Sequence, residues 1–100
     1  MKKLITIGLL ITTMYSAEHI IDQKNKHYVP NNITVAVGDT LVFKNSDSFA
    51  HNAYTDDEKN EFDFGMQAPG KDKRVEIKEK SDFVIECAIH PNMSLQVHVK

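Results

Sequence analysis

The sequence predicts an all-β domain, and three observations favour this class. Short stretches in which apolar and polar residues alternate recur along the chain, as expected of strands with one buried face. Turn-forming residues separate these stretches, and after residue 17 no ten residues sustain apolar side chains at helical spacing. Several short strands joined by turns are typical of a β-sandwich or a β-barrel.

The first seventeen residues have the composition of a secretory signal peptide. Two lysines precede the uncharged, mostly apolar residues 4–15, and the small residues Ser16 and Ala17 suit a signal peptidase. The apolar run is shorter than the roughly 20 residues of a spanning helix, and an uncleaved anchor is the alternative. We expect a signal peptide over 1–17, a mature domain over 18–100, and export, for example to a periplasm, without stable membrane insertion.

The mature domain is expected to contain strands in chain order at residues 18–23, 26–30, 33–37, 41–43, 74–78, 82–87 and 95–100. By their alternation, the following side chains are expected to face the core: Ile33, Val35, Val37, Leu41, Phe43, Val75, Ile77, Phe83, Ile85, Cys87, Val97 and Val99. The charged stretch 55–73 is expected to be loop, apart from a short strand near Phe62 and Phe64.

Charge and cysteine content narrow the function. Without the two lysines at its start, the chain has 10 Lys and Arg against 14 Asp and Glu, a net charge of −4 that argues against nucleic acid. Its single cysteine, Cys87, excludes an intramolecular disulfide. In an oxidising compartment a lone thiol either forms a disulfide with another chain, is open to oxidation, or is protected from it. A bound metal would protect it.

Cys87 begins the motif C-x2-H-x2-M, which continues with His90 and Met93 between two expected strands. One loop could therefore place all three side chains around one ion. Thiolate, imidazole and thioether are soft or borderline donors, which select copper, or zinc with the thioether left out. A trigonal copper site needs a second imidazole, and we expect it from His51, because the uncharged run 49–51 predicts burial.

The remaining histidines are expected at the surface. His98 alternates with apolar neighbours on the last strand and so points away from the core. His19 and His27 have nothing around them in the sequence that specifies a site. Met66 is expected to pack inside the protein, with a secondary copper contact as the alternative.

Residues 28–54 and 83–99 together resemble a small cupredoxin, the blue copper fold of plastocyanin, pseudoazurin and amicyanin. The two-residue gap between the histidine and the methionine of the motif is similar to the short ligand loop of amicyanin. The resemblance implies a Greek-key β-sandwich or barrel that binds one type 1 copper ion. The ligands that it implies are His51, Cys87 and His90 as the strong set, with Met93 as the weak axial one.

The resemblance also implies roles for neighbouring residues. The side chain of Asn52 would tie the two ligand loops together, and its backbone N–H would point toward the sulfur. Pro91 would stiffen the loop. The exposed ring edge of His90, with Pro91 and Ala50 around it, would form the port for electrons.

We therefore expect a monomeric one-electron carrier rather than an enzyme, with redox protein partners such as a c-type cytochrome or a dehydrogenase. The acidic cluster of Asp56, Asp57, Glu58, Glu61 and Asp63 is either a solvated loop or a surface that steers a basic partner. The alternatives are a copper delivery or resistance protein, a thiol hydrolase that uses cysteine and histidine, and a structural zinc domain.

Overall fold

The computed structural model describes residues 16–100, and every regular element in this range is a β-strand. The strands are β1 (Glu18–Lys24), β2 (His27–Val29), β3 (Asn32–Val35), β4 (Thr40–Asn45), β5 (Ala53–Thr55), β6 (Phe62–Asp63), β7 (Lys73–Glu76), β8 (Asp82–Cys87) and β9 (Ser94–Val99). The all-β prediction is confirmed. Between residues 16 and 100 no helix has the length and apolarity needed to cross a membrane. The expected signal peptide lies almost wholly outside the described residues.

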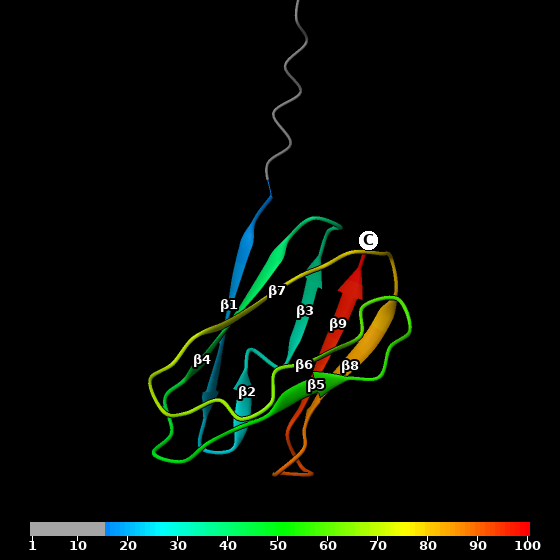
Figure 1. The fold of residues 1–100 in the computed structure, drawn as a ribbon. Helices are drawn as coiled ribbons and strands as arrows, with labels where there is room; N and C mark the ends of the chain where they lie inside the picture. The colour runs from blue at the N-terminus through cyan, green and yellow to red at the C-terminus, as the bar shows by residue number, and fades with distance from the viewer. Residues whose placement is uncertain (1–15) are drawn as a thin grey trace, which may run out of the picture.

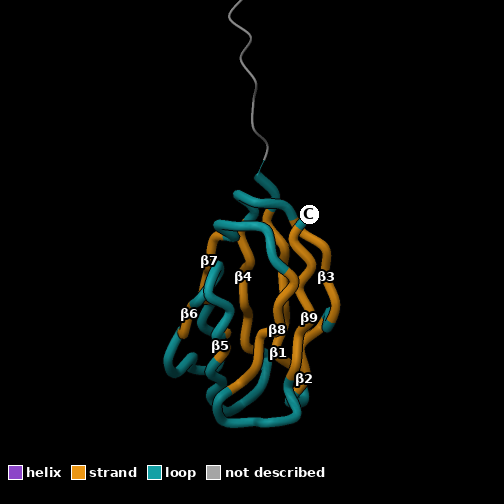
Figure 2. Tube along the Cα trace, turned by 90° about the vertical axis from the view of Figure 1, so that its right-hand side faces the viewer, coloured by secondary structure: helices purple, strands orange, loops and turns teal. Residues whose placement is uncertain are grey.

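The strands form two sheets, with the orders β2-β1-β4-β7 and β3-β9-β8-β5-β6 (Figure 1). The chain leaves the first sheet after β2, adds β3 to the second, and returns as β4. As a result β1 and β4 are parallel neighbours, and so are β3 and β9. Parallel neighbours cannot be joined by a tight hairpin, so the chain between them makes a longer connection, which here passes through the other sheet. Figure 2 shows the strands running along the molecule, with the connecting loops gathered toward its two ends.

One apolar core fills the space between the sheets. Its buried members are Ile21, Tyr28, Val35, Leu41, Phe43, Ala53, Ile77, Phe83, Ile85, Cys87, Met93, Leu95, Val97 and Val99. The predicted alternation is confirmed along β8, where every second side chain from Phe83 to Cys87 is buried and the others are exposed. Near the centre, the ring of Phe43 packs edge-on against Tyr28 and Phe64, with centroids 6.0 and 5.3 Å away.

Three apolar side chains that were expected inside are exposed instead. Val37 is 46% exposed, because β3 ends at Val35 and a turn with Gly38 at a φ of 93° follows. Met66 is 65% exposed, so the prediction that it packs inside the protein is wrong. Phe49 is 38% exposed. For Val37 the expectation rested on alternation, which predicts burial only while a strand stays paired. Met66 and Phe49 lie in loops, where the apolar character of a side chain does not by itself decide its burial.

Three connections lie at the same end of the sandwich, the lower end in Figure 1, opposite the C-terminus. They are the β1–β2 turn, the segment 46–52 between β4 and β5, and the loop 88–93 between β8 and β9. Antiparallel pairing of Ala53 with Cys87 holds the second and third of them side by side. Every predicted ligand belongs to these two connections or to the end of β8.

Candidate metal centre

Three of the predicted ligands converge at this end of the sandwich. The Sγ atom of Cys87 lies 3.9 Å from Nδ1 of His51 and 3.7 Å from Nδ1 of His90. The three donor atoms all lie within 4.8 Å of one another. His51 is fully buried, Cys87 is almost fully buried, and His90 is partly exposed. The site is therefore closed on the protein side and reaches solvent through one imidazole.

Met93 lies at the end of the same loop. Its N–H donates to the carbonyl of His90 at 3.0 Å, and this turn directs the chain back into β9. The Met93 side chain is 1% exposed and belongs to the buried cluster that contains Cys87. The loop thus buries a thioether beside the group of three nitrogen and sulfur donors.

Backbone pairing fixes His51 in place. Its N–H donates to the carbonyl of Gln67 at 3.1 Å, and the N–H of Gln67 donates back at 2.7 Å. The Gln67 side chain is itself buried: its amide donates to the carbonyls of Phe43 and Lys71, and its oxygen accepts from Gln23. The sequence analysis did not single out Gln67, although it decides where the backbone of His51 lies.

Asp47 holds the opposite side of the His51 ring. One carboxylate oxygen lies 2.8 Å from Nε2 of His51, and the carboxylate also accepts the N–H groups of Asn25 and Lys26. Burial opposes ionisation of Asp47, but the hydrogen bonds from Lys26, His51 and Asn25 outweigh it and keep the pKa below its usual value. A charged carboxylate favours the proton on Nε2, which leaves the lone pair of Nδ1 facing the thiol.

Asn52 supports the sulfur through its backbone. Its N–H donates to Sγ of Cys87 at 3.3 Å, and its carbonyl accepts the N–H of Ala88 at 3.0 Å. The second bond joins the two ligand loops. The side chain of Asn52 points elsewhere and donates to Asp63 at 2.8 Å. The expectation that this side chain ties the ligand loops together is therefore wrong, because the backbone does so.

Aromatic packing covers the two histidine rings. The ring of Phe49 lies 5.3 Å from the centroids of both His51 and His90, which are 5.0 Å from each other. Burial lowers the pKa of His90, and the neighbouring His51 and Lys26 lower it further. A lower pKa favours the neutral imidazole that a metal ligand must be. His90 remains partly exposed and is followed in the chain by exposed Pro91.

The other three histidines are not members of this cluster. His98 is at the surface beside Asp82, as predicted. His27 is exposed, and His19 is bonded to Asp39 at 2.8 Å. Within residues 16–100, the group of His, Cys, Asp and Glu side chains that could hold a metal ion is the one formed by His51, Cys87 and His90.

A thiolate, two imidazoles and a nearby thioether form the donor set of a blue copper site. The sequence profile of the family described as copper binding proteins, plastocyanin/azurin family, matches residues 16–100. The chain belongs to this family, which confirms the cupredoxin resemblance. The donor set fits one type 1 copper ion.

Individual relatives agree with this assignment. Plastocyanin from Cucumis sativus is 32% identical over 81 residues, which cover 69% of this chain and 81% of that protein. Chloroplastic plastocyanin from Fritillaria agrestis is 38% identical over 74 residues, 63% of this chain. The match spans less than half of that relative, 45% of its length.

Solved structures share the fold. A reduced amicyanin variant superposes with a TM-score of 0.77 at 20% identity, over 88% of this chain and 87% of amicyanin. The copper-containing nitrite reductase of Thermus scotoductus gives a TM-score of 0.74 at 23% identity, over 81% of this chain and 22% of the reductase. The predicted β-sandwich of the cupredoxin type is confirmed.

Proposed function

We propose that this protein is a one-electron carrier in which His51, Cys87 and His90 hold copper and Met93 is the weak axial ligand. The observation that carries the proposal is the convergence of three donor atoms within 4.8 Å, from two loops and a strand end. Bound copper would supply a couple between Cu(I) and Cu(II). The chain would hold the donors in fixed positions and would connect the copper to solvent through partly exposed His90.

The donors are held by the protein itself. Gln67 clamps the backbone of His51, Asp47 holds its ring, and the backbone of Asn52 contacts the sulfur and the ligand loop. Hydrogen bonds of this kind orient the ligands and tune the metal that they bind. A site fixed in advance needs little rearrangement between two oxidation states, which suits an electron carrier.

The exposed edge of His90 is the proposed port for electrons. Pro91 follows it in the chain and the partly exposed ring of Phe49 packs against it, and Ala50 is proposed to complete the patch. Such a small apolar patch suits brief encounters rather than permanent assembly. We propose a monomer that meets redox proteins such as a c-type cytochrome or a dehydrogenase.

Export completes the proposal, with residues 1–17 as the signal peptide and 18–100 as the mature copper domain. Ala17 already pairs with the folded domain: its N–H donates to Asp39 and its carbonyl accepts from Thr40, both at 3.0 Å. Cleavage after Ala17 would remove these two bonds. The mass of the exported protein tests this boundary. A mass that corresponds to a chain beginning before residue 18 would contradict cleavage after Ala17.

A visible spectrum after addition of Cu(II) tests the site. We expect an intense thiolate-to-copper band that is absent in Cys87→Ser. The variant His51→Gln should weaken or abolish the band, whereas the matched variant His98→Gln should keep it, because His98 lies at the surface beside Asp82. An unchanged spectrum in Cys87→Ser would refute the proposed site.

The burial of the donors favours a carrier over a copper delivery protein. A delivery protein must release its ion readily, whereas here the thiol and His51 are enclosed. We expect the Cu(I) form to lose its ion slowly to a mild chelator. Rapid and complete loss would favour delivery or resistance, and ready alkylation of Cys87 in the copper-loaded protein would favour a thiol enzyme.

A further inference from the structure

A hollow of about 380 Å³ lies against the partly exposed His90. The residues that line it are Asn25, Lys26, His27, His90, Pro91 and Asn92. This lining includes a lysine and polar side chains but no carboxylate. The proposed port therefore opens beside a positive charge.

The lysine is held in place rather than free at the tip of a loop. Asn25 and Lys26 form the β1–β2 turn with φ values of 53° and 60°, and both of their N–H groups donate to the carboxylate of Asp47. The ammonium of Lys26 lies 5.6 Å from the centroid of the Phe49 ring, close enough for a cation–π contact. Because Phe49 packs on both histidine rings, the charge has a fixed position relative to the site.

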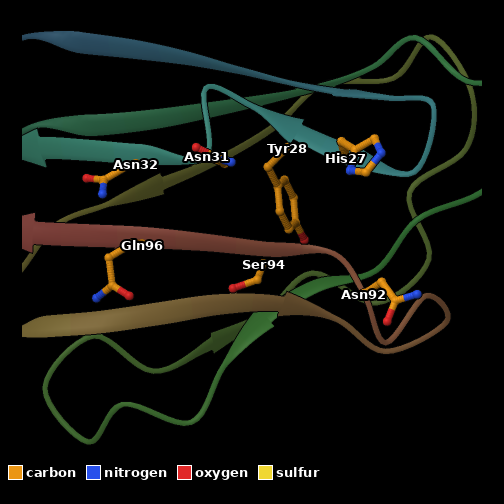
Figure 3. A pocket seen from close by; sticks show the side chains of 7 residues that line it. All are labelled: His27, Tyr28, Asn31, Asn32, Asn92, Ser94 and Gln96. Atoms are coloured by element: carbon orange, nitrogen blue, oxygen red, sulfur yellow. The ribbon is translucent and has the colours of Figure 1, made fainter.

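Two neighbouring hollows also have no acidic side chain in their lining. A second hollow shares His27 and continues past Lys24. A third extends along β9, where Figure 3 shows His27 and Asn92 at one end and Asn32 and Gln96 at the other. The described residues that line these two hollows include one lysine, Lys24, and one histidine, His27. None of them is an aspartate or a glutamate.

Three carboxylates at this end of the molecule lie outside the hollows. Asp47 accepts from the His51 ring, Asp22 from the hydroxyl of Ser46, and Asp63 from the amide of Asn52. None of the three lines these hollows beside His27 or His90. Glu86 lies on the solvent face of β8, opposite the face that buries Cys87, and accepts the hydroxyl of Tyr54. Lys24 and Lys26 form no ion pair within residues 16–100.

The acidic cluster of residues 56–63 lies mostly toward the other end of the molecule. Asp57 accepts the N–H of Asn60 and the hydroxyl of Ser81, just before β8 begins. Cys87 ends the same six-residue strand, which places Asp57 about 17 Å away along the strand direction. Asp63 is the exception in the cluster, because it is bonded to Asn52 beside the metal end. This position and these bonds favour the interpretation of the segment as a structured, solvated loop.

We propose that the protein docks a redox partner whose contact surface is acidic, through a basic rim formed by Lys24 and Lys26 beside His90. The proposal rests on the electron-carrier function and adds the chemistry of the partner. Opposite charges speed the encounter and orient it, so that the partner meets the protein at the exposed imidazole.

Two small oxidants of opposite charge test the rim. Reduced, copper-loaded protein is mixed with ferricyanide, or with tris(phenanthroline)cobalt(III), at an ionic strength of about 10 mM, and loss of one electron from Cu(I) is followed by the growth of the blue band. At this ionic strength the charge on Lys26 acts over about 30 Å. Lys26→Gln should slow the ferricyanide reaction about three- to tenfold and should not slow the cobalt reaction.

The matched control is Lys80→Gln, which removes the same charge from an exposed position near the start of β8. It should change the ferricyanide rate by less than twofold, about the effect of net charge alone. Lys26→Arg should keep the wild-type rate. A reduction potential equal to that of the wild type in Lys26→Gln would show that the rate change comes from the encounter.

A protein-sized probe extends the test. Poly-L-glutamate should compete with ferricyanide for wild-type protein and much less for Lys26→Gln. Equal effects of Lys26→Gln and Lys80→Gln would overturn the proposal. So would self-association at low salt that depends on Lys26, because a second copy would then occupy the rim. Absence of a blue band in the wild type would instead refute the proposed copper function.

Discussion

Asp47 connects the metal centre to the turn that bears Lys26. Its carboxylate accepts from the His51 ring on one side and from the Asn25 and Lys26 backbone on the other. A negative charge in contact with a copper ligand stabilises the more positive, oxidised ion. We therefore expect Asp47 both to position His51 and to lower the reduction potential.

Replacement of Asp47 by Asn tests both roles. The amide keeps the shape but removes the charge, so the reduction potential should rise and the free energy of unfolding should fall by about 1–3 kcal/mol. A redox titration and denaturant unfolding measure the two effects. The control is Asp72→Asn, which removes an exposed carboxylate paired with Lys44. Equal potentials in Asp47→Asn and the wild type would leave Asp47 with a structural role only.

The convergence of the candidate donors was predicted from the sequence, whereas their supports were not. Cys87, His90 and Met93 lie within seven residues, so their spacing alone indicated a common site. His51 was expected to be a ligand because the uncharged run 49–51 predicted burial. His51 is buried, although Phe49 in the same run is partly exposed. Nothing local marks Asp47, whose role depends on a turn 21 residues earlier that meets it only after folding.

At the scale of elements, β1 is anchored to β4 by the carboxylate of Asp39. This group accepts hydrogen bonds from the N–H of Ala36, the ring of His19 and the N–H of Ala17. The Ala36 bond contributes most, and together these bonds lower the pKa of Asp39 to about 2. His19, expected to be an ordinary surface residue, is thus part of this anchor.

The anchor should make stability depend on pH. A folded pKa of about 2, below the ordinary 3.8, contributes about 2 kcal/mol above pH 4, and this contribution is lost as the pH falls toward 2. In a chain that retains Ala17, Asp39→Asn should therefore be less stable by about 2 kcal/mol at pH 7, and the difference should be smaller in a chain that begins at Glu18, which lacks the Ala17 bond. Urea unfolding at several pH values measures the difference from the wild type, which should shrink between pH 4 and pH 2. A difference that stayed constant over this range would contradict the assignment.

Strand pairing was harder to predict than strand existence. Alternation indicated the buried faces of β8 and β9, but it could not show that β1 lies parallel to β4 or β3 parallel to β9. These contacts join segments about 20 or more residues apart, and no local pattern records which partner a strand will choose. The crossovers that result bring the β1–β2 turn to the metal end.

At the scale of the whole molecule, one apolar core joins the two sheets. Its members extend from Ile21 to Val99 through both sheets, and Cys87 and Met93 contribute their side chains to it. We therefore expect the copper-free protein to fold to the same sandwich. Copper should add stability, because it binds donors that only the folded chain brings together.

Thermal unfolding with and without copper tests this expectation. At a free copper concentration about 100 times the Kd, binding contributes about 2.7 kcal/mol, which for a domain of this size raises Tm by about 10 °C or more. Calorimetry on the copper-free and Cu(I) forms measures the shift. Cys87→Ser should fold but show a much smaller shift. An equal shift in that variant would indicate that copper binds elsewhere.

The central claim is that the side chains of His51, Cys87 and His90 meet on one copper ion. A crystal structure of the copper-loaded protein, with anomalous data collected at the copper edge, tests it most directly. The account predicts one strong peak among Nδ1 of His51, Sγ of Cys87 and Nδ1 of His90, next to the thioether of Met93. A peak at His19, His27 or His98 instead, with the Cys87 thiol free, would contradict it.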